Sequence, residues 1–94
     1  ANNHCLDRGK TGLERTITQI ESFSIPYAGT YRNAIERKQL YPLFIREKGF
    51  CIAILNYTYG TNGIKVSAPN IVNYIDKKTI LKYIAPKPYA RMLL

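Results

Sequence analysis

The sequence predicts an α+β fold in which two N-terminal helices pack on a four-stranded, mostly antiparallel sheet. Three observations predict it. Apolar residues recur at helical spacing in the first part of the chain, their period shortens toward alternation after Pro42, and an Asn-Gly pair stands among β-branched and aromatic residues. With 94 residues, 46% of them hydrophobic, the chain is long enough for one domain with a single small core.

Residues 1–10 are expected to form a loop-like lead-in to a single basic domain over residues 11–94, and we interpret the N-terminus as the cut end of a longer protein. A helix over about 12–23 follows, because its apolar side chains are spaced by four, three and three: Leu13, Ile17, Ile20 and Phe23. Thr11 and Glu14 fit a capping box at its start. A second helix is predicted over about 31–40, with Thr30 as its cap and Pro42 beyond its end.

The sheet is predicted from residue 43 onward. Residues 43–45 are short and apolar, and residues 50–59 resemble a central strand because both faces are apolar at its start. Asn62-Gly63 predicts a hairpin turn to a return strand at 64–67. Residues 70–84 favour a second hairpin by their Ile, Val and Tyr content, although their apolar residues also fit helical faces.

The two cysteines carry little chemistry by themselves. Cys51 lies in an apolar run and is expected to be a buried small hydrophobe, whereas Cys5 lies in the polar lead-in and is expected to be exposed. A disulfide between them stays open as an alternative. Two cysteines without a CxxC pair favour a reducing cytosol as the working compartment.

Charge gives the strongest functional indication. The chain has 14 Lys and Arg against 6 Asp and Glu, a net charge of +8, with eight tyrosines among the cations. Cations neutralise phosphates and tyrosine rings stack on unpaired bases, so the pattern favours nucleic-acid contact, with an acidic protein partner as the alternative. The candidate nucleic-acid-binding residues are Arg8, Lys10, Lys48, Lys65, Lys77, Lys78 and Lys82.

A catalytic role would need side chains that can donate or accept a proton. His4 is the only histidine, which excludes a site with two imidazoles but leaves a mixed acid–base site open. The candidate catalytic residues are His4, Arg46, Tyr57 and Tyr59. No metal and no other cofactor is expected, because His4-Cys5 lacks a second ligand pair and the carboxylates are scattered.

The size, the basicity and the order of helices before an antiparallel sheet at 50–84 resemble the C-terminal toxin domains of contact-dependent growth inhibition systems. They are also similar to the barnase, EndoU, colicin and RelE-like ribonucleases. The Val-Glu-Asn-Asn motif of those toxins and the doubled histidine of EndoU sites are absent from this sequence.

The resemblance implies a metal-independent toxin ribonuclease that cleaves RNA, often tRNA. It implies neutralisation by an acidic immunity protein, elongation factor Tu as a host activator, and no stable membrane insertion. It also implies delivery from the cell surface, as part of a larger protein, into the cytoplasm of a target cell. The alternative is a non-catalytic nucleic-acid-binding domain of a phage or ribosome-associated protein.

Overall fold

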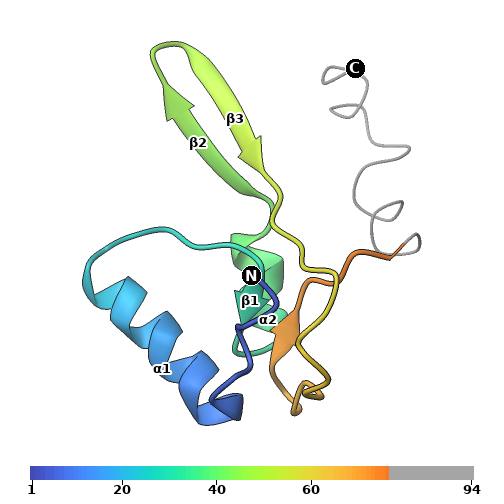
Figure 1. Ribbon diagram of the computed structural model, residues 1–94. Coiled ribbons are helices and arrows are strands. Elements are labelled where there is room, and N and C mark those ends of the chain that lie inside the picture. The colour runs from blue at the N-terminus through green and yellow to red at the C-terminus, as the bar shows by residue number, and fades with distance from the viewer. Residues whose placement is uncertain (77–94) are drawn as a thin grey trace.

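The computed structural model describes residues 1–76, which form two helices and two antiparallel two-stranded sheets (Figure 1). In chain order the elements are α1 (Gly9–Ser22), β1 (Thr30–Tyr31), α2 (Ala34–Leu40), β2 (Leu43–Glu47), β3 (Phe50–Ile54) and β4 (Ile71–Val72). The predicted α+β class is confirmed. A single four-stranded sheet is not found in the described part of the chain, since β1 pairs with β4 and β2 pairs with β3.

Helix α1 is the predicted first helix, but it begins earlier than expected. Its first residue is Gly9 and its N-cap is Arg8, which makes no side-chain capping bond, so the predicted capping box of Thr11 and Glu14 is wrong. The reason lies in the preceding turn, where Leu6 is buried and packs with Leu13 of the helix. Burying Leu6 brings the preceding segment against the core and lets the helix start before Thr11.

Helix α2 is shorter than predicted and has a different cap. The Asn33 side chain accepts a hydrogen bond from the backbone amide of Glu36 at 2.8 Å, which satisfies one of the unpaired donors of the first turn. Thr30, the predicted cap, instead pairs with Val72 as part of β1. The predicted cap is therefore wrong because long-range strand pairing takes residues 30 and 31.

The core lies between α1 and the β1–β4 pair. Leu6, Leu13, Ile17 and Val72 form one buried cluster, and Tyr31 is fully buried close by. Four tyrosines extend from it in edge-to-face or tilted contacts, with ring centroids 6.0 to 6.3 Å apart: Tyr27, Tyr31, Tyr41 and Tyr57. These rings pack on one another, so they serve the interior of the fold.

Asn73 joins four segments through its backbone and side chain. Its amide N–H donates to the Gly29 carbonyl at 2.8 Å, and its carbonyl accepts from the Thr58 amide at 2.9 Å. Its side-chain oxygen accepts from Arg37 Nε at 2.8 Å, and its side-chain nitrogen donates to the Asn56 carbonyl at 3.2 Å. Since Asn73 is only 2% exposed, its own groups in these bonds are shielded from water.

Strands β2 and β3 form a hairpin that extends away from the core (Figure 1). Leu43 pairs with Ile54 at its base and Glu47 with Phe50 at its tip, across a turn in which Lys48 and Gly49 have φ of 48° and 83°. The predicted central strand is wrong, since Phe50 and Ile52 are 72% and 51% exposed and the pairing partner precedes them in the chain.

The predicted hairpin between 50–59 and 64–67 is wrong, although the turn itself forms. Asn62 and Gly63 both have positive φ, of 54° and 77°, but residues 64–67 form no strand. In the second predicted hairpin, over 70–84, the first strand includes β4, which pairs with β1. The part of this hairpin beyond residue 76 lies outside the described residues.

The cysteine predictions are also corrected. Cys51 is exposed on the hairpin, Cys5 is half-buried, and both thiols are free, so they form no disulfide with each other. Burial is reversed because the hairpin lies outside the core while the N-terminal turn enters it. Neither α1 nor α2 has the length and apolarity that a membrane crossing requires.

Arg32 connects α1 to α2. Its guanidinium donates to Glu21 and to Thr18 Oγ1 of α1, and to Glu36 Oε2 of α2 at 3.0 Å. Burial alone would raise the pKa of Glu36, but hydrogen bonds from Tyr27, the Arg32 amide and the Arg32 guanidinium together lower it.

Acid is therefore expected to weaken the fold through Glu36. Because its pKa is lowered on folding, its contribution is complete above the ordinary carboxyl value of about 4.5 and is lost as the pH falls through the lowered value. Urea unfolding between pH 3 and pH 7 should show this loss. The Glu36→Gln variant should show a smaller pH dependence, and an equal dependence would contradict the assignment.

A core substitution in α1 should be costly. Ile17→Ala removes a side chain that is 1% exposed and should lower the free energy of unfolding by about 2–5 kcal/mol, since a buried cavity remains. Ile35→Ala in α2 is the control, because that side chain is 71% exposed and its loss should change stability by less than about 0.5 kcal/mol. Equal losses in urea unfolding would contradict the position of the core.

Candidate functional site

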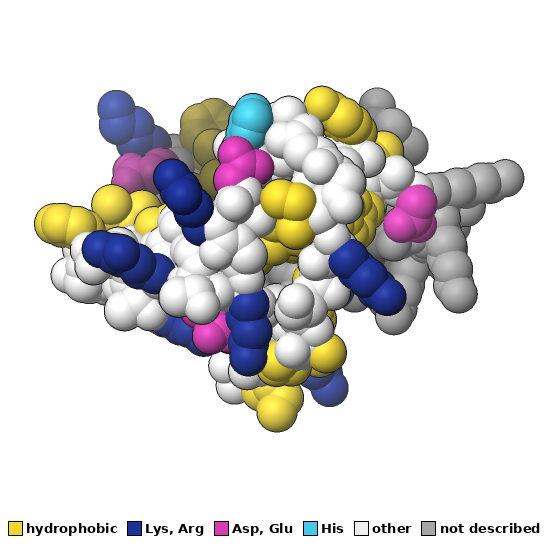
Figure 2. Space-filling view, turned by 60° about the horizontal axis from the view of Figure 1, so that its bottom comes forward, with side chains coloured by type: hydrophobic (Ala, Val, Ile, Leu, Met, Phe, Trp, Pro, Cys, Tyr) yellow, Lys and Arg dark blue, Asp and Glu magenta, His cyan; other side chains and the backbone are white. Residues whose placement is uncertain are grey.

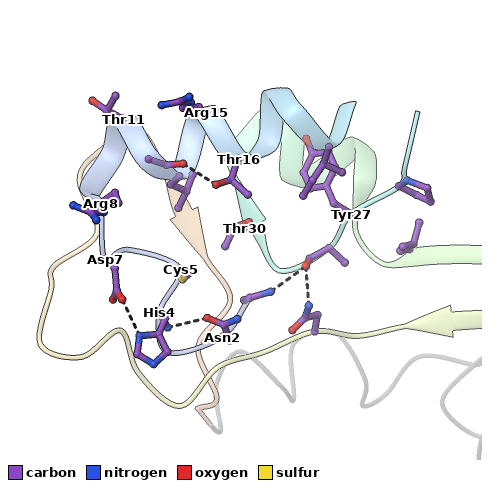
Figure 3. A pocket seen from close by; sticks show the side chains of 18 of the residues that line it. Asn2, His4, Cys5, Asp7, Arg8, Thr11, Arg15, Thr16, Tyr27 and Thr30 are labelled. Atoms are coloured by element: carbon purple, nitrogen blue, oxygen red, sulfur yellow. Dashed lines mark hydrogen bonds and ion pairs between the residues drawn. The ribbon is translucent and has the colours of Figure 1, made fainter. Parts of the chain in front are cut away.

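An open groove of about 1000 Å³ lies between α1 and the N-terminal segment. Figure 3 shows its lining: one wall is the length of α1, and the opposite side is formed by the first residues of the chain and the segment before β1. The base of the β2–β3 hairpin contributes Leu43 and Ile54. The groove is thus built from segments that lie far apart in the sequence.

The side chains of His4 and Asp7 are hydrogen-bonded to each other at the edge of this groove. His4 Nδ1 lies 2.8 Å from Asp7 Oδ2, and the His4 backbone amide donates to Asn2 Oδ1 at 2.8 Å, so both the ring and the backbone are held (Figure 3). The side chains are 66% and 47% exposed, which leaves the pair accessible from solvent. A carboxylate on Nδ1 orients the ring and leaves Nε2 for proton exchange with a ligand.

Arg8 and Arg15 supply positive charge along the α1 wall. They are seven residues apart, which corresponds to about 10.5 Å along a helix axis. Asp7 is the one acid among the described side chains that line the groove, and it is paired with His4. Figure 2 shows the histidine at the surface beside an acidic side chain, with Lys and Arg side chains spread around the same face. The groove therefore favours an anionic ligand.

Gly12 allows Arg8 to approach α1 closely. A Cβ at Gly12 would lie 2.3 Å from the Cβ of Arg8, a distance at which one of the two must move. The Arg8 carbonyl accepts the Gly12 amide at 3.1 Å, so the two backbones are also bonded. Glycine at position 12 thus sets where Arg8 meets the groove.

The structure separates the candidate catalytic residues. His4 lies in the groove with Arg8, but Arg46, Tyr57 and Tyr59 are not among the residues that line it. Tyr57 accepts a hydrogen bond from the Tyr41 hydroxyl at 2.8 Å, and Tyr59 is 77% exposed. Arg46 lies in the hairpin, where it lines a separate hollow of about 270 Å³.

The candidate nucleic-acid-binding residues are also dispersed. Arg8 lines the groove, Lys10 is exposed on α1 outside the lining, and Lys65 is exposed after the Asn62-Gly63 turn. Lys48 lies with Arg46 at the tip of the hairpin. The remaining three, Lys77, Lys78 and Lys82, lie outside the described residues. The described cations thus do not form one surface.

The sequence reasoning missed the partners of His4. Asp7 follows His4 by three residues, which in a turn brings the two side chains together, and that spacing could have indicated the pair. Asn62 Nδ2 lies 3.3 Å from His4 Nδ1, and Asn3 Nδ2 donates to Asn62 Oδ1 at 3.2 Å. These contacts join residues that are 58 and 59 positions apart, so no local sequence pattern indicates them. Within residues 1–76, no three His, Cys, Asp or Glu side chains are grouped closely enough to hold a metal ion.

A comparison with protein families shows which family the chain belongs to. A family model described as "Bacterial capsule synthesis protein PGA_cap" matches residues 1–90. This chain belongs to that capsule synthesis family. No curated protein and no solved structure matches the chain.

Membership in the capsule synthesis family corrects the functional prediction. The resemblance to contact-dependent growth inhibition toxins is wrong, and so are the toxin ribonuclease function and its nucleic-acid-binding alternative. Size, basicity and element order led to this error because they are shared by many small basic domains. The resemblance was also the reason to expect RNA, an immunity protein and an elongation factor as partners, and delivery into a target cell. These stay predictions, and they no longer have the support of that resemblance.

Gly12 offers a test of how the groove of this capsule synthesis domain is built. An exposed Gly→Ala change in a helix ordinarily stabilises it by up to about 1 kcal/mol. Gly12→Ala is expected to destabilise the protein instead, by about 1–3 kcal/mol, since the new methyl group meets Arg8. Thermal and urea unfolding would measure this, and a stabilised variant would contradict the close approach.

Proposed function

We propose that this domain acts in capsule synthesis by holding an anionic polyglutamate chain in the groove between α1 and the N-terminal segment. The single observation that carries the proposal is the pairing of the family match with a groove whose unpaired lining charges are positive. The family concerns the polyglutamate capsule, a polymer that bears one ionised carboxylate per residue at neutral pH. Such a ligand matches the charge of the groove.

The spacing of the two arginines supports a polymer over a single glutamate. Arg8 and Arg15 are separated by about 10.5 Å along α1, whereas one residue of an extended peptide spans about 3.5 Å. The two guanidiniums would therefore pair with different carboxylates of the same chain. Two contacts on one ligand raise its affinity by making the second contact intramolecular.

His4 gives the site its chemistry. With Asp7 on Nδ1, the imidazole can exchange a proton at Nε2 with a group of the bound chain. Forming or breaking an amide link requires such a transfer to or from the nitrogen. His4 is thus the residue through which the groove would act on the polymer, while the two arginines hold it.

The proposal is tested by titrating the 94-residue chain with a labelled polyglutamate fragment and following fluorescence anisotropy. The Arg8→Gln, Arg15→Gln double variant should bind roughly three- to tenfold more weakly, because two exposed charge pairs are lost. Binding of the unchanged protein should weaken as salt is raised. A matched amount of free glutamate should bind far more weakly than the polymer.

The control is the Lys10→Gln, Lys65→Gln double variant, which removes the same charge from two exposed residues outside the groove lining. It should bind nearly as well as the unchanged protein. If both double variants lose affinity equally, total charge and not the groove holds the polymer. If the unchanged protein fails to bind polyglutamate at low salt, the proposed function is wrong.

A further inference from the structure

Asn62 lies in a loop that is firmly held beside the N-terminal segment. Thr61, 6% exposed, donates from its hydroxyl to the Ile64 carbonyl at 2.6 Å and lies 2.9 Å from the Tyr74 hydroxyl. Asn62 itself has φ of 54°, a left-handed conformation that asparagine tolerates better than most residues. The loop therefore presents the Asn62 amide to His4 from a fixed backbone.

Two groups compete for one nitrogen of His4. Asp7 Oδ2, at 2.8 Å from Nδ1, can only accept, so its bond requires a proton on Nδ1. Asn62 Nδ2, at 3.3 Å from the same atom, can only donate, so its bond requires a lone pair there. One nitrogen cannot satisfy both at once.

Asn3 bonds to the oxygen of the Asn62 amide. Its Nδ2 donates to Asn62 Oδ1 at 3.2 Å, which leaves Asn62 Nδ2 for His4. The contacts therefore define two arrangements of the ring. In one, Nδ1–H pairs with Asp7 and Nε2 carries a lone pair; in the other, Nδ1 accepts from Asn62 and Nε2 carries the proton.

We propose that Asn62 is a positioning residue that lets neutral His4 present Nε2–H to a carboxylate of a ligand in the groove. This inference rests on the proposed polyglutamate function. A carboxylate at Nε2 needs a donor there, which in a neutral ring places the lone pair on Nδ1 and against Asp7. Asn62 relieves that repulsion by donating to Nδ1. Asp7 cannot take this role, because its carboxylate only accepts.

Nitrogen chemical shifts of the imidazole test this directly. Since His4 is the only histidine, labelling the protein with ¹⁵N-histidine gives one pair of ring signals. In alkaline buffer, where imidazoles are neutral, these signals report the ratio of Nε2–H to Nδ1–H forms. The unchanged protein should show both forms, because Asp7 favours Nδ1–H and Asn62 favours Nε2–H. A spectrum of Nδ1–H alone would overturn the proposal, because Asn62 Nδ2 would then make no bond to the ring.

Two substitutions remove the donor without straining the loop. Asn62→Gly keeps the positive φ at no cost, and Asn62→Asp replaces the amide nitrogen by an acceptor. Each should shift the ratio toward Nδ1–H by about three- to tenfold, since one hydrogen bond is lost or reversed. Asp7→Asn should shift it the other way. If the Asn62 variants keep the ratio of the unchanged protein, with backbone signals of residues 60–64 intact, the inference is wrong.

Adding polyglutamate separates this inference from the proposed function. The polymer should raise the Nε2–H share in the unchanged protein and raise it less in Asn62→Gly. If the polymer binds and both proteins respond equally, Asn62 has no positioning role. If the polymer does not bind, the proposed function fails, while the ratios in the free proteins still decide whether Asn62 sets the tautomer.

Discussion

The fold depends on the buried hydrogen bonds of Asn73. This one residue bonds to the segment before β1, to α2 and to two positions after β3, so it fixes elements that share little apolar contact. The apolar cluster around Leu6 and Ile17 is small, as expected for a chain of this length. A polar side chain that is 2% exposed and fully bonded therefore supplies the specificity that a larger core would otherwise provide. The groove depends on it indirectly, because the Gly29 bond holds the strand that closes one side.

Whether a feature could be predicted from the sequence depends on how far apart in the chain the interacting residues are. The first helix was predictable because Leu13 and Ile17 face one side within a few turns, and the Asn62-Gly63 turn was predictable because positive φ is a property of those residues. The pairing of β1 with β4 was not predictable, since it joins residues some forty positions apart. Apolar character at Phe50 and Ile52 could not distinguish a central strand from an exposed hairpin.

The candidate site shows the same division. His4 was identified as the lone imidazole, and Arg8 as a cation beside it, from the sequence alone. The pair with Asp7 is local, whereas the contact with Asn62 exists only because the 60–63 loop folds back to the N-terminal segment. Net charge predicts an anionic partner, but phosphates and carboxylates attract the same cations. Our proposal of a carboxylate polymer therefore rests on the family match and not on the charge.

The series of packed tyrosines gives this protein an optical property of its own. The chain has no tryptophan, so its near-ultraviolet absorption and emission come from tyrosine. Of the six tyrosines within residues 1–76, four have ring centroids within 6.3 Å of another tyrosine ring. Burial raises the pKa of Tyr27, Tyr31 and Tyr41 above the ordinary value of 10. In the native state these phenols stay protonated at a pH where unfolded tyrosines ionise, so alkali favours the unfolded chain. The share of the phenolate absorbance that comes from these three tyrosines consequently reports unfolding, without any added dye.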